Sequence, residues 1–213
     1  MNKKSLGIFG TSGMAREAGD ICWALGLEPF YIARDSQELN KWNGAGEVIL
    51  ESEIEQVSHC SFVIGIGDNM IRKQIASRFL GSLHFTNLIH PSVTFGYGQS
   101  AIIDNRQGTI IAAGARLTNS IKMGDFVLIN QNATVAHDCI IDSYVHIAPG
   151  ANISGNVHLE ERVWIGAGAV INQGNEIEKR RVGKNTLVGS GALVTADCQP
   201  DSVYVGVPAR RLK

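Results

Sequence analysis

Cysteines are few in this chain, and none of them is placed to form a pair. Cys22, Cys60, Cys139 and Cys198 are the only four among 213 residues, and no CxxC motif joins any two of them. Such wide spacing is not typical of a disulfide framework or of a zinc site. We therefore expect reduced thiols in the core of a cytoplasmic protein, with no bound metal.

Charge and long hydrophobic runs are also scarce. Charged residues make up 18% of the chain and the formal net charge is −1, so nothing recommends nucleic acid or an anionic membrane as a partner. No apolar run approaches the roughly 20 residues that span a bilayer. The first ten residues lack the apolar core of a signal peptide. The hydrophobic content of 44% is nevertheless enough for a packed core, in one large domain or two modest ones.

A repeat of six residues is the most informative feature that the sequence does contain. From Ile111 to Glu176 every block of six begins with an aliphatic-type residue, over eleven successive blocks. The fifth residue is small or apolar in the first ten of them. This period is neither helical nor the alternation of a plain strand, and it predicts a parallel β-helix with three blocks to a turn. Residues 111–176 would form between three and four turns.

The repeat is interrupted once. After Ile177 comes the charged run EKRR (178–181), and blocks resume at Val182, Val188 and Val194, one residue early. We expect the charged run to leave the surface of the coil as a loop or a tightened corner.

Residues 5–90 lack the repeat and alternate between two other patterns. Strand-like runs lie at 6–10, 30–33 and 62–67, and helical patterns at 14–25 and 69–80. Alternation of this kind predicts a small parallel α/β sheet. We expect an α/β domain over residues 1–90 and the β-helix over residues 91–213.

The turn after the first expected strand is a candidate phosphate site. It reads Gly10-Thr-Ser-Gly13, where backbone amides and the positive end of a helix would meet an anion. The full GxGxxG pattern is absent, so a plain strand-to-helix turn is the alternative. Asp35 lies a little over 20 residues further on, where an acid could hold a ribose hydroxyl. An ordinary loop residue is the alternative there.

Two histidines inside the repeat are candidates for acid–base chemistry. His137 is the third residue of its block and should project outward, with Asp138 directly after it. A carboxylate beside an imidazole stabilises the imidazolium that forms in catalysis. Adjacent residues on a strand point to opposite faces, so this pairing requires a turn. A solvated side chain is the alternative, for His137 as for His146.

An ordered set of motifs resembles one family across nearly the whole chain. The motifs are the GxSGxxxE-like start, IGIGDNMIRKQI, NLIHPS, HDC and HIAPGA within the coil, and a closing VGVPARR. They resemble the two-domain acyltransferases that include sialic acid O-acetyltransferases and nucleotide 4-amino-sugar N-acetyltransferases of the bacillosamine type. The resemblance implies a left-handed β-helix, a homotrimer, and acetyl-CoA bound between neighbouring turns. It also implies an N-terminal domain that holds the nucleotide of the acceptor.

The same resemblance implies roles for residues of the coil. His137 matches the catalytic base and Asp138 the acid that tunes it. His146 matches a residue that contacts the thioester end of acetyl-CoA. Ala167 and Ser190 match positions whose backbone contacts the pantetheine, and the irregular stretch 177–182 lies between them.

In the front domain the resemblance implies a nucleotide-binding set. Ser12, Gly13 and Met14, together with Gly10, match the phosphate loop, and Gly67 matches a turn near the base or sugar. Where relatives often have an acidic pair after the second strand, this chain has Arg34 and Asp35. We expect the arginine to alter which nucleotide is preferred.

Three functions remain open at this stage. The first is N-acetylation of the C4 amine of a UDP- or dTDP-linked 4-amino-4,6-dideoxy sugar for a surface glycan, which the phosphate-type loop favours. The second is O-acetylation of sialic acid or a related sugar. The third is a β-helix without catalysis, either a scaffold or binding protein or a metal protein of the γ-carbonic anhydrase kind. A metal protein would need three histidines, and His137 and His146 alone do not provide them. The sequence leaves the nucleotide (UDP, dTDP or GDP) and the sugar stereochemistry open.

Overall fold

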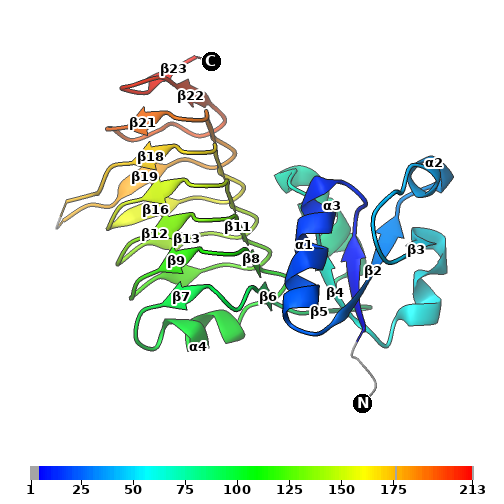
Figure 1. The fold of residues 1–213 in the computed structure, drawn as a ribbon. Coiled ribbons are helices and arrows are strands. Elements are labelled where there is room, and N and C mark those ends of the chain that lie inside the picture. Colours follow the sequence, from blue (N-terminus) through cyan, green and yellow to red (C-terminus); the bar gives the residue numbers. More distant parts are fainter. Residues whose placement is uncertain (1–4, 176, 213) are drawn as a thin grey trace.

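The computed structural model describes residues 5–175 and 177–212. Figure 1 shows an α/β domain beside a tall coil of short strands, with the C-terminus at the far end of the coil. The N-terminal parallel sheet and the left-handed parallel β-helix confirm the predicted fold class.

The α/β domain is built on one sheet of five parallel strands. The strands are β1 (Ser5–Phe9), β2 (Glu28–Ala33), β3 (Glu47–Leu50), β4 (Ser61–Ile64) and β5 (His84–Phe85). The helices are α1 (Gly13–Ala24), α2 (Ser36–Asn40) and α3 (Asn69–Phe79), with a 3₁₀ helix η1 (Glu51–Val57). The three strands and two helices expected from the sequence are present. The elements β3, β5, α2 and η1 were not predicted, because each is too short to show a clear period.

The order of these strands, β3-β2-β1-β4-β5, creates a switch point in the sheet. From β1 the chain proceeds to β2 and β3 on one side, and it then returns to β4 and β5 on the other. A crevice opens at the carboxyl ends of the two central strands at such a point. The segments that follow β1 and β4 border this crevice.

The coil has three faces, each of which takes one strand per turn. The first face contains β6 (Leu88–Ile89), β8 (Ile110–Ile111), β11 (Leu128–Ile129), β14 (His146–Ile147), β17 (Trp164–Ile165), β20 (Leu187–Val188), β22 (Val203–Val205) and the antiparallel β23 (Arg210–Arg211). The second face contains β7 (Thr94–Phe95), β9 (Arg116–Leu117), β12 (Thr134–Val135), β15 (Asn152–Ile153), β18 (Val170–Ile171) and β21 (Leu193–Val194). The third face contains β10 (Lys122–Met123), β13 (Ile140–Ile141), β16 (Val157–Leu159) and β19 (Arg180–Val182).

The repeat explains the interior of the coil. The first residue of each block points inward and stacks on its equivalents above and below, as Ile129, Ile147 and Ile165 do on the first face. All three are at most 1% exposed. The small fifth residues fill the space beside them, and the turns between faces use residues with positive φ. Burial of these aliphatic side chains is the main stabilising contribution to the coil.

The coil begins earlier than the repeat of the sequence indicates. Strands β6 and β7 precede Ile111, and helix α4 (Gln99–Asp104) then stands where the first strand of the third face would be. The side-chain amide of Gln99 donates to the carbonyl of Ile121 at 2.8 Å and accepts from its N–H at 2.9 Å. Gln99 thus replaces the backbone partner that a strand would provide, and Ile103 closes the apolar interior.

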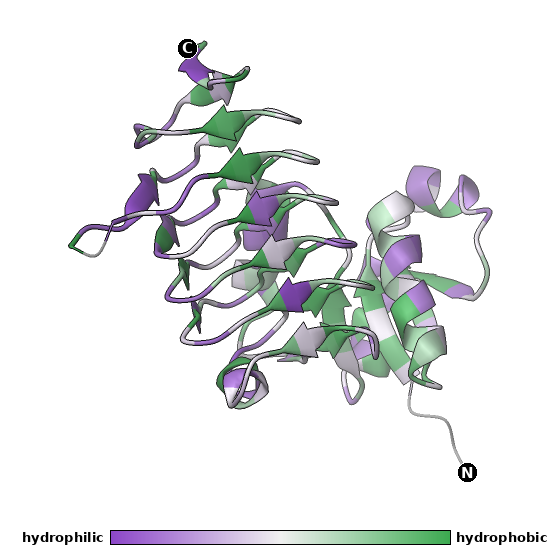
Figure 2. Cartoon of the chain, turned by 60° about the vertical axis from the view of Figure 1, so that its left-hand side comes forward, coloured by the Kyte–Doolittle hydropathy of each residue, from purple (hydrophilic) through white to green (hydrophobic). Residues whose placement is uncertain are grey.

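The interruption of the repeat is an insertion that forms a loop, one of the two forms expected from the sequence. Val182 is the inward residue of β19 on the third face, and it lies eleven positions after Ile171, the inward residue of β18. In the regular part of the coil, the inward residues of successive faces are six positions apart. The corner between β18 and β19 therefore holds five additional residues. They form a loop that leaves the surface, and Figure 2 shows it standing out from the edge of the coil. A tightened corner is excluded.

The two domains share an apolar contact on the outside of the first face. The outward residues Leu88, Ile110 and Leu128 lie in register on neighbouring strands and are at most 1% exposed. They pack in one cluster with Ala15 and Ala18 of α1. This contact fixes which face of the coil the α/β domain covers.

Candidate active site

His137 and Asp138 lie at the corner between the second and third faces, and the structure brings their side chains together. Nδ1 of His137 is 2.7 Å from Oδ2 of Asp138. A carboxylate only accepts, so Nδ1 carries the hydrogen and Nε2 carries the free lone pair. The side chains are 61% and 57% exposed, so Nε2 is open to a substrate.

A left-handed residue provides the turn that this pairing requires. Asp138 has a φ of 60°, a conformation that aspartate tolerates better than most side chains. Its N–H donates to the carbonyl of Asn119 in the turn below at 3.2 Å. The side chain consequently bends back to the imidazole of His137 instead of pointing to the opposite face.

Gly155 supports the imidazole ring from the neighbouring turn. A Cβ atom at Gly155 would lie 2.6 Å from Cε1 and 2.7 Å from Nε2 of His137, so only glycine leaves room for the ring. The next residue, Asn156, donates its N–H to the carbonyl of His137 at 2.9 Å. Gly155 comes eighteen residues after His137, which is one complete turn of three blocks. The period could therefore have identified it, although the sequence analysis did not.

The inserted loop forms the other wall of this corner. A cavity of roughly 630 Å³ lies between the loop and the histidine. The residues that line it are His137, Asp138, Gly155, Asn156, Gln173, Gly174, Asn175 and Lys179. The site is thus a polar pocket that holds one exposed imidazole, which is the arrangement needed for general base chemistry.

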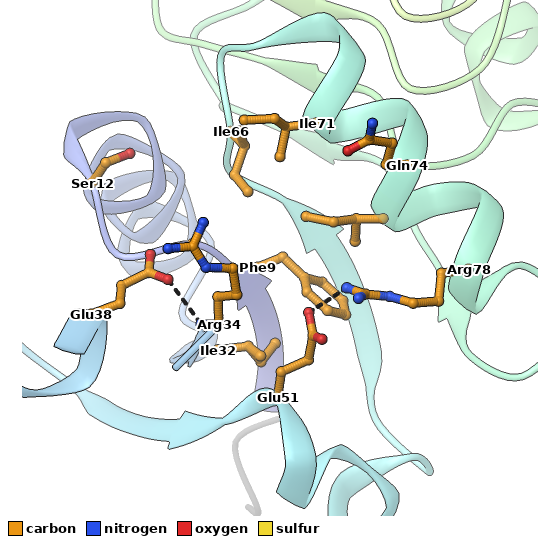
Figure 3. A pocket seen from close by; sticks show the side chains of 12 residues that line it. Phe9, Ser12, Ile32, Arg34, Glu38, Glu51, Ile66, Ile71, Gln74 and Arg78 are labelled. Carbon is orange, nitrogen blue, oxygen red and sulfur yellow. Dashed lines mark hydrogen bonds and ion pairs between the residues drawn. The ribbon is translucent and has the colours of Figure 1, made fainter. Parts of the chain in front are cut away.

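A second cavity, of roughly 450 Å³, lies at the switch point of the α/β domain. Figure 3 shows its walls, which combine apolar side chains with charged ones. They are Phe9, Gly10, Ser12, Ile32, Arg34, Glu38, Glu51, Ile66, Ile71, Gln74, Ile75 and Arg78. Such a cavity is large enough for a nucleoside, with apolar walls for a base and polar groups for its edges.

The predicted phosphate loop borders this cavity. Gly10 has a φ of 103°, which favours glycine, and a Cβ there would approach Ile66 to 3.0 Å. Ser12 is the N-cap of α1 but makes no side-chain capping bond, and the first turn of α1 has no acidic residue. The first amides of the helix therefore suit a phosphate. Gly13 is exposed, whereas Met14 packs against the core of the domain.

Arg34 and Asp35 have different surroundings. Arg34 lines the cavity, whereas Asp35 is the N-cap of α2, with Oδ1 accepting from the N–H groups of Gln37 and Glu38. Its pKa is lowered, first by the backbone hydrogen bond from Glu38 and then by the Arg34 side chain. Among the described residues that line the cavity, the acids are Glu38 and Glu51, not Asp35.

The sequence analysis missed these two acids, which the structure explains. Glu38 accepts from the hydroxyl of Thr11 at 2.7 Å and from the N–H of Arg34 at 2.8 Å, so it braces the phosphate loop. Glu51 forms an ion pair with Arg78 across the cavity (Figure 3). Both acids lie in helices, α2 and η1, that are too short to predict, and no motif marked them.

The motif IGIGDNMIRKQI joins the two domains. Arg72 of α3 is fully buried, and its guanidinium donates to Asn69 and to five carbonyl oxygens, those of Ile66, Gly67, Phe126, Tyr144 and Val145. Asn69 in turn donates to the carbonyls of Arg162 and Val163. Burial lowers the pKa of Arg72 to about 9, so the group remains charged at neutral pH. The cation is balanced by carbonyl dipoles from both domains.

His146 belongs to this domain contact. It is 4% exposed, with Nδ1 3.0 Å from the carbonyl of Gly67 and Nε2 2.7 Å from the side-chain amide of Asn130. Burial, and then the charge of Arg72, lower the pKa of His146 to about 4. The ring is therefore neutral and fixed, and the structure does not bring it to His137. Its contact with acetyl-CoA stays a prediction, as does a direct role for Gly67 near the acceptor.

Ala167 and Ser190 lie together at the corner between the first and second faces. The N–H of Gly191 donates to the carbonyl of Ala167 at 2.9 Å, so the two positions stack in neighbouring turns. Both side chains are small and exposed, which leaves the backbone accessible. The two positions remain stacked despite the insertion between them, and their contact with pantetheine stays a prediction.

Two further findings concern membranes and metal ions. Among residues 5–175 and 177–212, no helix has the length and apolarity to span a bilayer. Within the same residues, no group of three or more His, Cys, Asp or Glu side chains is placed to hold a metal ion.

Cys139 follows Asp138 directly, but its thiol is buried and burial raises its pKa, so it is not a nucleophile near neutral pH.

The fold and the two cavities define a two-domain transferase of the hexapeptide-repeat class. Residues 5–79 match the PglD N-terminal domain, and residues 120–155 match the bacterial transferase hexapeptide (six repeats). The chain is 33% identical over 155 residues to the GDP-perosamine N-acetyltransferase of Escherichia coli O157:H7, covering 71% of this chain and 67% of that protein.

Solved structures agree over the full length. The acetyltransferase domain of PglB from Neisseria gonorrhoeae FA1090 is 31% identical, with a TM-score of 0.85, covering 99% of this chain and 100% of that one. The same domain has been solved in complex with acetyl coenzyme A, again with a TM-score of 0.85, at 27% identity and the same coverage. The chain therefore belongs to the family of two-domain sugar acetyltransferases with a PglD-type N-terminal domain, which confirms the resemblance seen in its motifs.

Proposed function

We propose that this protein transfers the acetyl group of acetyl-CoA to the C4 amine of a nucleotide-linked 4-amino-4,6-dideoxy sugar, for surface glycan biosynthesis. The observation that carries the proposal is the exposed His137–Asp138 pair in a polar pocket, in a chain that also has a nucleoside-sized cavity. The relatives support it, since the E. coli protein is a GDP-perosamine N-acetyltransferase and the PglB domain binds acetyl-CoA. We expect the protein to act in the cytoplasm.

The chemistry follows from the free lone pair on Nε2 of His137. The sugar nitrogen attacks the thioester carbonyl while Nε2 takes its proton. The C–N bond forms, the C–S bond breaks, and the proton passes to the leaving thiolate of CoA. Asp138 stabilises the imidazolium. Both ring nitrogens of His146 are engaged within the chain, so we assign the oxyanion to a backbone amide.

Transfer is direct, without an acetyl-enzyme. The thiol nearest to the pair, that of Cys139, points into the coil and donates to the carbonyl of Ser154 at 3.2 Å. Holding both substrates in one cleft supplies the positioning that direct attack requires.

The separation of the two cavities supports assembly into a homotrimer. The α/β domain covers the first face and contacts the corner between the third and first faces, at Tyr144 and Arg162. His137 lies at a different corner, between the second and third faces. An acceptor held in the cavity of one chain would therefore meet His137 of a neighbouring chain. In a trimer whose threefold axis runs parallel to the three coils, such corners of different chains lie together.

Complementation tests this assembly. His137→Ala removes the base and Ser12→Trp blocks the phosphate loop, so each variant alone should be inactive. Co-expression should restore activity, because mixed trimers contain sites with one intact half from each chain. No restored activity in mixed trimers of confirmed composition would contradict the shared site.

A thiol-release assay tests the function itself. We expect release of CoA with one of a panel of UDP-, dTDP- and GDP-linked 4-amino sugars, and loss of turnover by roughly a thousandfold in His137→Ala, with acetyl-CoA binding retained. Release with sialic acid alone would favour O-acetylation. No release with any acceptor would favour a binding protein, and wild-type turnover in His137→Ala would refute the proposed base.

A further inference from the structure

The loop inserted between β18 and β19 is ordered by its own hydrogen bonds. Oδ1 of Asn175 accepts from the N–H groups of Ile177 at 2.9 Å and Glu178 at 2.7 Å, and the N–H of Asn175 donates to the carbonyl of Glu178 at 2.9 Å. Gly174 donates to the carbonyl of Gly155 at 3.2 Å. The loop is therefore attached to the turn on which the imidazole of His137 rests.

The last residue of the loop reaches the catalytic corner. Nζ of Lys179 donates to the backbone carbonyl of Asp138, two turns away, and to Oδ1 of Asn156 at 2.7 Å in the turn between them. The side-chain amide of Asn156 donates to the carbonyl of Asn175. Lys179, Asn156 and Asn175 thus form one network that ends at Asp138.

We propose that Lys179 is a positioning residue for the reaction, which holds Asp138 in the conformation that supports His137. This inference rests on the proposed function. Asp138 is left-handed, with its N–H bound to the turn below and its carbonyl bound to Lys179 from above. Because both backbone groups of Asp138 are held, its carboxylate stays against Nδ1 of His137. The imidazole then keeps the orientation that exposes Nε2.

The inserted residues account for how a lysine reaches this place. In a regular corner the chain passes from the second to the third face within one block, and Val182 would follow Ile171 after six residues instead of eleven. The five additional residues let the backbone leave the surface and return, so the stem of Lys179 can cross the turn of Asn156.

Three single variants test the proposal in the full-length protein. Lys179→Met keeps the length of the stem but removes the donor, Lys179→Arg keeps a donor, and Lys184→Met removes a lysine that pairs with Glu161 at another corner. For Lys179→Met we expect kcat to fall about tenfold or more, since small displacements of a catalytic group are costly. The KM for acetyl-CoA and the Tm should stay close to wild type. Lys179→Arg should recover most of the kcat, and Lys184→Met should keep it.

Wild-type kcat in Lys179→Met would overturn the proposal, as would an equal loss in Lys184→Met. A fall in Tm that parallels the loss of kcat in all three variants would also overturn it, because the role would then be structural. Failure of the proposed function looks different: the wild-type protein itself would release no CoA with any nucleotide-linked amino sugar. A structure of Lys179→Met then remains informative, because the proposal predicts that the 2.7 Å contact between His137 and Asp138 is lost.

Discussion

His137 and His146 are nine residues apart in the same coil, and their surroundings are opposite. His137 stands at an open corner with one carboxylate partner, and 61% of its side chain is exposed. His146 is 4% exposed, and the centroid of its ring lies 4.2 Å from the ring centroid of Trp164. Both of its ring nitrogens are within hydrogen-bond distance of groups in the same chain. Both residues occupy outward positions of the repeat, so what covers each position decides its chemistry.

The difference between the two histidines corresponds to the separate roles that we propose for the two domains. The coil alone would expose every outward residue of the first face, including His146. The α/β domain covers part of that face, and Arg72 and Asn69 fix its position. We propose that the open corner performs the reaction, whereas contacts on the covered face fix the position of the α/β domain and its nucleoside-sized cavity.

Removal of the buried guanidinium should have the largest effect on stability. Arg72→Met leaves several buried carbonyls without a donor, so the free energy of unfolding should fall by about 3 kcal/mol or more. Arg78→Met is the matched control on the same helix, because its ion pair is half exposed and should contribute less than about 1 kcal/mol. Urea unfolding checks both values. Equal small losses would show that the domain contact is not held by Arg72.

Added bulk beside the exposed histidine should disturb the reaction but not the fold. In Gly155→Ala the new methyl would displace the imidazole of His137, and we expect kcat to fall by roughly thirtyfold with little change in Tm. Steady-state kinetics and a thermal melt measure the two quantities. The residual activity of His137→Ala should not fall further when Gly155→Ala is added, and an additive loss would mean that Gly155 acts by another route.

The covered histidine should make stability depend on pH. Its pKa is about 4 in the folded protein, against an ordinary value near 6.5 in the unfolded chain, so the unfolded chain binds more protons between these values. Its contribution is therefore present above about pH 6.5 and is lost as the pH falls toward 4. Between pH 7 and pH 5 the loss should be about 2 kcal/mol, and His146→Gln should remove it. Urea unfolding at several pH values measures the free energy of unfolding. The same pH dependence in the wild type and in His146→Gln would contradict this prediction.

The regular part of the coil could be predicted because its period is repeated many times. The first residue of every block from Ile111 to Ile171 lies in the expected inward position. The strands of the coil before Ile111 were not recognised individually, because α4 replaces a strand there and its substitute partner, Gln99, acts through a side chain. The length of the insertion before Val182 was not predicted, since spacing alone does not reveal which face a strand joins.

The site was predictable only where it is local in sequence. The contact between His137 and Asp138 follows from adjacency and one turn, and the phosphate loop from its position between a strand and a helix. Arg72 and Lys179 act on groups that are 54 and 41 residues away in the chain. Their partners are backbone carbonyls, which carry no signal in a sequence. The burial of His146 likewise depends on a second domain that the repeat does not describe.

A matched pair of substitutions tests the central comparison most directly. His137→Gln and His146→Gln would be assayed side by side for CoA release, at saturating acetyl-CoA and a nucleotide-linked 4-amino sugar. The account predicts that His137→Gln loses turnover by roughly a thousandfold and that His146→Gln stays within about tenfold of wild type at pH 7.5. Full activity in His137→Gln, together with its loss in His146→Gln, would contradict the account and place the base at the covered face.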